Sequence, residues 1–308
     1  MENLVVIDLG SNSVRMTITE VHDDGTTKVV AQEKDMVRLS EDMGPEKILQ
    51  DNAMARTIEA MKKFVKTFKS LPNVHLHAVA TAATRQAKNQ SEFLTNLKDA
   101  TGVEVKVISG EQEAYYDYLG VTNTLPVVNA VIMDTGGASI ELIFMLQRRI
   151  QNLISIPMGS VSLTETYLDP EHITAPALFK LTTAMDRLYN DIWWLDKARN
   201  LPIVALGGSN RTLAKIERRR AKTPHFENIH GFRMSTDQVN RVFSTVIGAD
   251  LTERKEIPGL SKDRADIIVG GMVPIVNLMR FLDSDRITFS QSGLREGVLY
   301  ERLHEMKR

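Results

Sequence analysis

The sequence contains no cysteine among its 308 residues. Disulfide bonds and thiolate metal sites are therefore excluded, and a reducing compartment is the expected location. The formal net charge is −1, which argues against a nucleic-acid partner because dedicated binders are distinctly basic. The net charge does not exclude a local basic groove, because it describes only the sum over the whole chain.

The sequence also lacks a long apolar run. Its longest nearly apolar stretch, from Ile267 to Val276, contains glycines and a proline and is too short to span a bilayer. No basic and then apolar leader precedes the first expected strand. These absences predict a cytoplasmic protein without a membrane partner, and the length suits two domains of ordinary size.

Common catalytic signatures are missing as well. The histidines show no HExxH or comparable metal spacing, so a zinc hydrolase is unsupported. The segment Gly207-Gly208-Ser209-Asn-Arg211 lacks the Gly-Lys-[Ser/Thr] ending of a P-loop and is not a dinucleotide fingerprint. A glycine pair that leads into a helix still offers backbone N–H groups to an anion, so this segment is a weak phosphate-site candidate.

What the sequence does have is one pattern used twice, an apolar run followed by Asp-x-Gly-x-x-Ser. The copies read Leu4-Val-Val-Ile-Asp8-Leu-Gly10-Ser11-Asn12-Ser13 and Ala130-Val-Ile-Met-Asp134-Thr-Gly136-Gly137-Ala138-Ser139. Small residues let backbone N–H groups approach a phosphate, and the aspartate can hold a divalent cation beside it. Hairpin turns favour the same residue types. The recurrence of Asp, Gly and Ser at equal offsets nevertheless predicts two phosphate loops. The two copies differ at the position two residues after the serine, which is Arg15 in the first and Glu141 in the second.

Three more segments are ambiguous by themselves. Ser109-Gly-Glu-Gln-Glu113 has the spacing of a capping box, which places Glu113 in a first helical turn, where acids are common for electrostatic reasons alone. Arg85 follows a strand and can fork onto phosphate oxygens, although a solvated arginine is the commoner case. The run Arg218-Arg219-Arg220 is either a solvated helix face or the lining of an entry groove for a polyanion.

The order of expected elements also repeats. Three strands (4–9, 14–21, 27–38) precede alternating helices and strands, and three more (127–134, 139–145, 150–156) begin a second round, so each half predicts a mixed sheet flanked by helices. The later elements are helices at 51–70, 91–100, 110–120, 160–168, 175–197, 210–221, 235–247, 251–257, 265–281 and 294–307, and strands at 74–80, 103–108, 202–206 and 286–290. Thr122–Pro126 is the expected boundary. Trp193 and Trp194 are expected in the core.

Together the motifs resemble the exopolyphosphatase / guanosine pentaphosphate phosphohydrolase (Ppx/GppA) family of the actin–Hsp70–sugar kinase superfamily. The resemblance rests on Val6–Ser13, Ala80-Thr81 with Arg85 and Asn89, Ser109–Ala114, Asp134–Glu141, Leu206–Ser209 with Arg211, Pro258–Leu260, Arg264–Ile268 and Ser292–Tyr300. It implies an α/β fold of two actin/ribonuclease H-like domains, each a mixed five-stranded sheet, with the active site in the interdomain cleft. The domains would span 1–124 and 125–308, with the last helix a candidate to pack back on the first.

The resemblance also implies roles for individual residues. Glu113 would be the general base that activates water, and Arg85 would neutralise charge on the transferred group. Mg²⁺ or another divalent cation would be held by Asp134 and Glu141, with Asp8 facing them. Phosphate contacts would come from Gly10, Ser11, Asn12, Ser13, Gly136, Gly137, Ala138, Ser139, Gly207, Gly208, Ser209 and Arg211.

The sequence departs from the family pattern at two positions. Ala138 replaces the usual third glycine, and because alanine resists positive φ the loop needs a permissive conformation or loses one phosphate approach. Ile140 replaces a threonine and removes a hydroxyl contact. The chain also ends at Arg308, without the extra C-terminal helical domains of longer members, which predicts a weaker grip on long polymers and less processive hydrolysis.

These inferences favour metal-dependent hydrolysis of the terminal phosphate of inorganic polyphosphate. The alternatives are hydrolysis of guanosine pentaphosphate to the tetraphosphate, a sugar or acetate-type kinase, and a polyphosphate or nucleotide sensor without turnover. The Ser-Gly-x-x-Glu-Ala signature at 109–114 points away from the kinase, and the presence of Glu113, Asp134 and Glu141 argues against the sensor. Homodimers are frequent in proteins similar to this family, so the resemblance also implies a homodimer as a partner to test.

Overall fold

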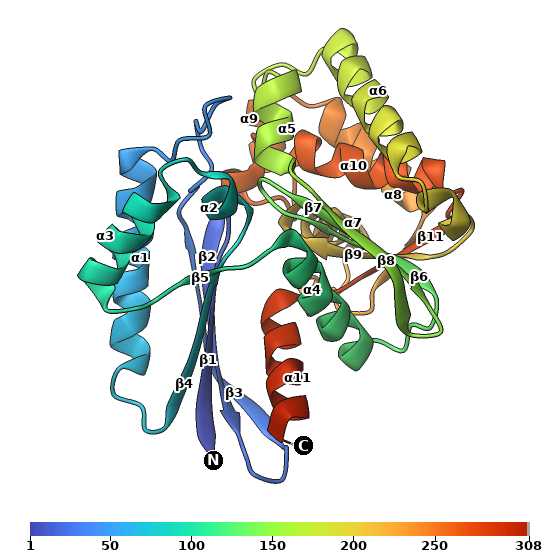
Figure 1. Ribbon diagram of the computed structural model, residues 1–308. Coiled ribbons are helices and arrows are strands. Elements are labelled where there is room, and N and C mark those ends of the chain that lie inside the picture. Colours follow the sequence, from blue (N-terminus) through green and yellow to red (C-terminus); the bar gives the residue numbers. More distant parts are fainter. Residues whose placement is uncertain (307–308) are drawn as a thin grey trace. The chain divides into compact units, whose positions relative to one another are not determined.

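The computed structural model describes residues 1–306 (Figure 1). The chain divides into two compact units. Unit 1 comprises Met1–Gly120 and the chain from Leu294 onward, and unit 2 comprises Val121–Gly293. The domain boundary at 124/125 stays a prediction. Among the described residues, no helix combines the length and the apolar character that crossing a membrane requires.

Unit 1 is built on a five-stranded mixed sheet with the order β3-β2-β1-β4-β5. β1, β2 and β3 form an antiparallel meander, whereas β4 runs parallel to β1 and β5 parallel to β4. The strands are β1 (Glu2–Leu9), β2 (Ser13–Val21), β3 (Thr27–Met36), β4 (Val74–Ala80) and β5 (Lys106–Val107). β5 is much shorter than the strand expected at 103–108, but every other expected strand of this half is present.

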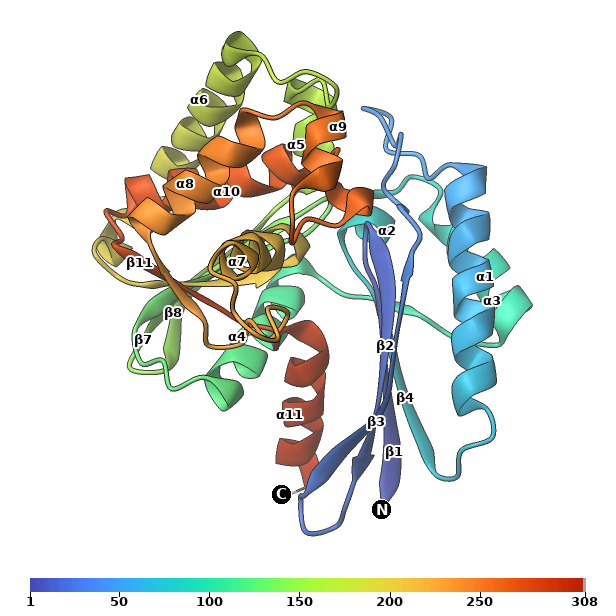
Figure 2. The same ribbon diagram turned by 180° about the vertical axis from the view of Figure 1, so that it is seen from behind.

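Helices cover both faces of this sheet because β1 is apolar on both. Val5 and Ile7 pack with α1 (Asp51–Phe68) and α3 (Gln90–Thr101), while Leu4 and Val6 pack with α4 (Gly110–Thr124) and α11 (Leu294–Met306). Figures 1 and 2 show the two pairs of helices on opposite sides of the strands. The short helix α2 (Ala82–Gln86) follows β4 directly.

The last helix, α11, packs on β1 of unit 1. Arg302 forks onto Glu2, with both N–O distances at 2.9 Å, and this ion pair lowers the pKa of Glu2. The Tyr116 hydroxyl donates to Glu301 at 2.9 Å. Burial and this contact raise the pKa of Tyr116, so its hydroxyl stays protonated at physiological pH.

His77 on β4 provides a pH-dependent term in stability. Its Nε2 is buried without a hydrogen-bond partner among residues 1–306, and burial lowers the pKa of His77 below its ordinary 6.5. The folded state therefore favours the neutral ring, and this contribution is complete above pH 6.5 and is lost as the pH falls through the lower folded pKa.

We therefore expect that His77→Gln flattens the decline in stability measured by urea unfolding between pH 7 and pH 5. His75→Gln is the matched control, because His75 lies on the same strand and is exposed. An equal slope in the wild type and in His77→Gln would contradict the assignment.

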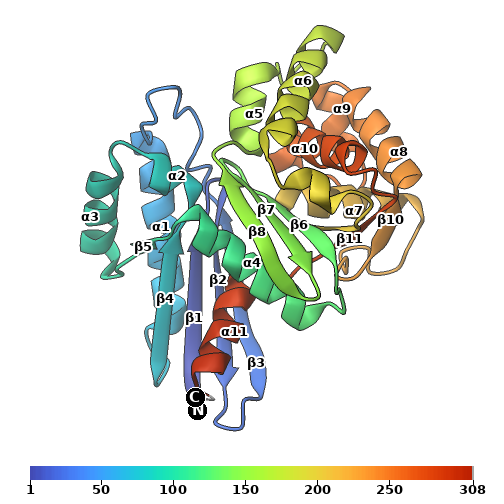
Figure 3. The same ribbon diagram turned by 45° about the vertical axis from the view of Figure 1, so that its right-hand side comes forward.

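Unit 2 is built on a six-stranded mixed sheet with the order β10-β11-β9-β6-β7-β8 (Figure 3). Its strands are β6 (Ala130–Thr135), β7 (Ile140–Leu146), β8 (Arg149–Ile156), β9 (Ile203–Gly207), β10 (Arg233–Ser235) and β11 (Arg286–Phe289). Five strands were expected. The sixth, β10, has only three residues, too few for an alternating pattern to reveal it.

One face of this sheet carries the core of unit 2. Val131, Met133, Ile140, Leu142 and Phe144 meet the apolar sides of the surrounding helices. These helices are α5 (Ser160–Tyr167), α6 (Ala175–Asp191), α7 (Gly208–Arg220), α8 (Thr236–Ile247), α9 (Leu251–Glu256) and α10 (Ile268–Phe281), with 3₁₀ turns at Leu195–Ala198 and Lys262–Arg264.

Two expectations for this part of the chain are wrong. Trp194 is buried and stacks on Phe144, but Trp193 is 71% exposed, because the helix expected over 175–197 ends at Asp191 and the chain turns there. The helix expected over 110–120 is also longer than predicted, since α4 continues to Thr124.

Candidate active site

The first Asp-x-Gly-x-x-Ser segment is a tight loop between β1 and β2. The Gly10 N–H donates to the Ser13 carbonyl at 3.2 Å. The carbonyl of Ser11 accepts from Ser40, and that of Asn12 from residues 37 and 38. Residues 37–40 therefore hold the loop from its carbonyl side.

The carbonyl groups of this loop accept hydrogen bonds, whereas several of its N–H groups donate none within the described chain. The N–H groups of Ser11 and Asn12 have no acceptor among residues 1–306, and the side-chain Nδ2 of Asn12 is buried and also lacks a partner there. Buried donors without acceptors are rare in proteins, so they mark a site for an external acceptor. Phosphate oxygens would supply one.

Arg85 and Glu113 form an ion pair in the same unit. Arg85 Nη1 lies 3.1 Å from Glu113 Oε2, and it also donates to the Ile108 carbonyl at 2.9 Å. Their side chains are 23% and 13% exposed. The pair is thus partly shielded from solvent but still accessible to it.

The local sequence explains why Glu113 is held there. Ser109 caps α4, since its Oγ accepts from the Gln112 N–H at 3.1 Å, as the capping pattern predicted. Glu111, in the same first turn, is exposed. Hydrogen bonds from its own N–H and from Ser109 lower the pKa of Glu111. α4 therefore begins at a fixed residue and presents Glu113 toward α2.

The second Asp-x-Gly-x-x-Ser segment repeats the closing hydrogen bond of the first. The Gly136 N–H donates to the Ser139 carbonyl at 3.0 Å. Here the carbonyls of Gly136 and Gly137 accept from the N–H groups of Ser160 and Val161, each at 2.9 Å, at the start of α5. The Gly137 N–H has no acceptor among residues 1–306, so this loop too keeps a donor at its tip.

The aspartates of the two loops have different partners across the hairpin. Asp8 lies opposite Arg15 in the β1–β2 register, whereas Asp134 lies opposite Glu141 in the β6–β7 register. Glu141 is 1% exposed and accepts a hydrogen bond from Ser155 at 2.8 Å. Unit 2 therefore places two carboxylates opposite each other on neighbouring strands, and carboxylate oxygens are the ligands that divalent cations prefer.

A divalent cation fits this donor set. Mg²⁺ is usually held by one or two carboxylates with the remaining positions left to water and phosphate, and Asp134 with Glu141 supplies two. Residues 1–306 contain no group of three or more His, Asp or Glu side chains placed to hold a metal. A cage made entirely of such side chains is therefore absent from the described chain, and a metal at Asp134 and Glu141 would rely on substrate oxygens.

The glycine pair after β9 lies beside an arginine for which the sequence predicted no role. Gly207 ends β9 beside Thr135, and Gly208 begins α7. A Cβ on Gly208 would collide with the guanidinium of Arg264, whose side chain is 8% exposed. Ser209 is buried in α7 and Arg211 is partly exposed. From the sequence, Arg264 could be named only within the Arg264–Ile268 motif. Its contact with Gly208 could not be predicted, because the 3₁₀ turn that holds Arg264 lies far along the sequence from Gly208.

Comparisons with known proteins identify the family of this chain. The model of the Ppx/GppA phosphatase family matches residues 17–306. The chain belongs to the Ppx/GppA phosphatase family. A crystal structure of the Aquifex aeolicus member is 30% identical with a TM-score of 0.81, and the match covers 99% of this chain and 98% of that one.

Curated relatives of this Ppx/GppA chain are longer. A guanosine-5'-triphosphate,3'-diphosphate pyrophosphatase of Vibrio vulnificus is 29% identical over 98% of this chain but only 59% of its own length. A bifunctional 3-dehydroquinate synthase/phosphatase of Fusobacterium nucleatum is 27% identical over 96% of this chain and 46% of its own length. The chain thus spans about half the length of these relatives.

The two mixed sheets with their helices are the actin-like architecture of this Ppx/GppA protein, as the resemblance implied. The family match begins at residue 17, after the first loop. The assignment of Gly10–Ser13 therefore rests on the loop's own geometry, above all on the closing hydrogen bond that both loops share.

The structure also explains the two departures from the family pattern. Ala138 is not among the residues with positive φ, so the loop has a conformation that alanine adopts without strain. Ile140 lies in the core of unit 2, on the sheet face opposite to Glu141 because neighbouring side chains alternate along a strand. A threonine hydroxyl at 140 would point away from the carboxylate pair.

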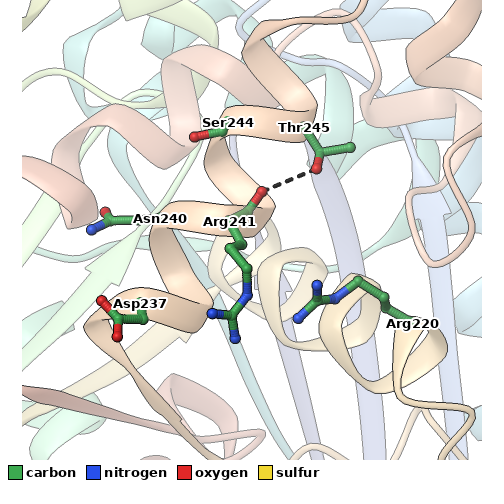
Figure 4. A pocket seen from close by; sticks show the side chains of 6 residues that line it. All are labelled: Arg220, Asp237, Asn240, Arg241, Ser244 and Thr245. Atoms are coloured by element: carbon green, nitrogen blue, oxygen red, sulfur yellow. Dashed lines mark hydrogen bonds between the residues drawn. The ribbon is translucent and has the colours of Figure 1, made fainter.

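The arginine run at the end of α7 does not form a uniformly basic groove. Arg218 donates to backbone carbonyls of residues 224–226, and Arg219 stacks on Phe226. Arg220 forks onto Glu217 and faces Arg241 across a groove that Asp237 also lines (Figure 4). Acids thus offset the arginines there, which favours a solvated helix face over an entry path for a polyanion.

Gly159 is required by the second loop of this Ppx/GppA chain. A Cβ at this position would lie 2.6–2.7 Å from backbone atoms of Gly136, Gly137 and Ala138. We expect Gly159→Ala to lower the free energy of unfolding by about 1–3 kcal/mol, because the loop or α5 must shift. Gly248→Ala, where the nearest atom is 3.2 Å away, is the control in a urea titration. Equal losses in the two variants would show that the loop yields easily.

Proposed function

We propose that this protein is a phosphoanhydride hydrolase that removes the terminal phosphate from inorganic polyphosphate with the help of Mg²⁺ or another divalent cation. The observation that carries the proposal is the ion pair between Arg85 and Glu113, in the unit whose Gly10–Ser13 loop offers donors without acceptors. A carboxylate beside a guanidinium and a phosphate-binding loop is what in-line attack by water requires.

In this proposal Glu113 orients the attacking water and takes its proton, while Arg85 neutralises charge on the transferred phosphoryl group. The peptide N–H groups of both loops bind phosphate oxygens, and Gly208 with Arg264 and Arg211 adds an anion site after β9. Asp134 and Glu141 would hold the cation, and Asp8 is the third carboxylate that we assign to it. A bound Mg²⁺ would offset charge on the phosphate oxygens.

The second candidate is hydrolysis of guanosine pentaphosphate to the tetraphosphate. It is favoured by the printed activity of the Vibrio vulnificus relative, and it would use the same base and loops. A cytoplasmic location belongs to either proposal and is supported by the lack of cysteine.

Release of orthophosphate from short polyphosphate, long polyphosphate and guanosine pentaphosphate separates these functions. We expect turnover with Mg²⁺ and a loss of roughly 100-fold or more on chelation, because the negative charge on the phosphate oxygens is then no longer offset by the cation. Restoring Mg²⁺ should recover the rate. Full activity in chelator would contradict the metal role, and phosphate transfer to an added sugar or acetate would indicate a kinase. Binding without release would indicate a sensor.

A further inference from the structure

Unit 2 contains a pocket that none of the residues discussed above explains. Its volume is about 510 Å³, within the range of small-molecule sites. Six of its lining residues are apolar: Pro126, Val127, Val128, Leu201, Pro202 and Val204. The others are Asn129, Asn200, Arg233, Arg286 and Thr288. The pocket thus combines apolar walls with two cations and two amides.

The strand register places the two arginines on one face of the sheet. Arg233 of β10 is paired with Thr288 of β11, and Thr288 is paired with Val204 of β9. Arg286 precedes Thr288 by two residues, so it points to the same side. Met234, which follows Arg233, lies in the core on the opposite face. The antiparallel pairing of β10 with β11 therefore brings both guanidiniums to the pocket.

This pocket is separate from the candidate active site. It lies where the parallel strands β6, β9 and β11 begin, whereas Asp134 and Gly207 lie where β6 and β9 end. The rise of a strand puts the first and last residues of β9 roughly 13 Å apart. A ligand in the pocket would consequently leave the glycine loops untouched.

The charges of the pocket are less offset than those in the groove of Figure 4. Arg233 makes no ion pair and no side-chain hydrogen bond within residues 1–306, and Arg286 has only an exposed contact of 3.5 Å with Asp285. No acid lines the pocket itself. The Oδ1 atom of Asn129 accepts a hydrogen bond from the Gln147 N–H at 2.7 Å. The Nδ2 group of the same amide is not used in that bond.

We infer that this pocket binds an organic phosphate with an apolar or aromatic body, of the size of a nucleoside monophosphate. Two guanidiniums fork onto phosphate oxygens, and the prolines, valines and leucine remove a flat apolar group from water. A bare polyphosphate would gain from the arginines but would leave those walls exposed to solvent.

Calorimetric titration of the whole chain with adenosine monophosphate tests the inference. We expect one-to-one binding, and a weakening of roughly tenfold or more in Arg233→Ala/Arg286→Ala, since charge-assisted hydrogen bonds are lost. Adenosine and inorganic phosphate should each bind less tightly than the nucleotide. Arg220→Ala/Arg241→Ala is the matched control, with two exposed arginines removed from another groove, and should bind like the wild type.

Three results would overturn the inference. Undetectable binding of adenosine monophosphate would reject the site, and unchanged affinity in the Arg233/Arg286 double variant would place any binding elsewhere. Inorganic phosphate binding as tightly as the nucleotide would reject the ligand class, because the apolar walls would then contribute nothing. Circular dichroism of both double variants controls for folding, and all four arginines are exposed.

Discussion

Replacing Glu113 with glutamine is expected to slow phosphate release from polyphosphate by roughly 100-fold or more, given the usual worth of a general base. Glutamine keeps the size of the side chain and can still contact Arg85, but it cannot take a proton from water. Binding of polyphosphate should persist, because the proposed phosphate contacts are the backbone donors of the Gly10–Ser13 and Gly136–Ser139 loops. Single-turnover phosphate release and equilibrium binding measure the two effects separately.

Glu111→Gln is the matched control for this variant. Glu111 occupies the same first turn of α4 and is exposed, so its loss should change the rate little. Unchanged turnover in Glu113→Gln would remove Glu113 from its proposed role. Loss of binding together with turnover would instead show that the Arg85–Glu113 pair shapes the phosphate site rather than activating water.

Replacing Arg254 with methionine is expected to lower the free energy of unfolding by about 3–5 kcal/mol, because a fully buried side chain loses all of its hydrogen bonds to the carbonyls around it. Arg254 is fully buried. Its guanidinium donates to the carbonyls of Ala249, Asp250 and Ala265 at 3.0–3.3 Å, and also to that of Pro170. Methionine fills much of the same volume but donates nothing.

Lys255→Met is the matched control, since Lys255 follows in the same helix and is exposed. Its unfolding midpoint in guanidinium chloride should match the wild type within about 0.5 kcal/mol, as surface substitutions usually do. An equally small change in Arg254→Met would mean that water replaces the guanidinium at those carbonyls. Because Ala265 follows Arg264, the unstable variant should also have a disturbed Gly208 site.

The sequence predicted those parts of the fold that depend on local patterns. The β1–β2 hairpin, the Ser109 cap and the contrast between Arg15 and Glu141 all follow from spacing, because a strand or helix brings fixed offsets together. In the structure Arg15 lies opposite Asp8 on the neighbouring strand, and Glu141 lies opposite Asp134.

Features that depend on distant parts of the chain were not predictable in this way. Arg264 reaches Gly208 only because a 3₁₀ turn packs beside α7, and the contact of Gly159 with the second loop requires α5 to start there. The conformation of Ala138 likewise depends on those carbonyl contacts rather than on the residue type. The pairing of Arg85 with Glu113 joins α2 to α4 across β5, and no offset in the sequence encodes it.

One contact within unit 2 bears on how its loops respond to a ligand. The glycine pair of α10 packs on the first residues of two helices: a Cβ on Gly270 would lie 2.9 Å from the Ser160 carbonyl, and one on Gly271 would strike Ser209. Ser160 holds the Gly136 carbonyl, and Ser209 follows the Gly207–Gly208 turn. The Gly136–Ser139 loop and the Gly207–Gly208 turn, both proposed to contact phosphate, therefore pack against α10 through Ser160 and Ser209. Because both segments contact the same helix, a ligand that binds at one of them should also slow hydrogen exchange of the backbone amides at the other.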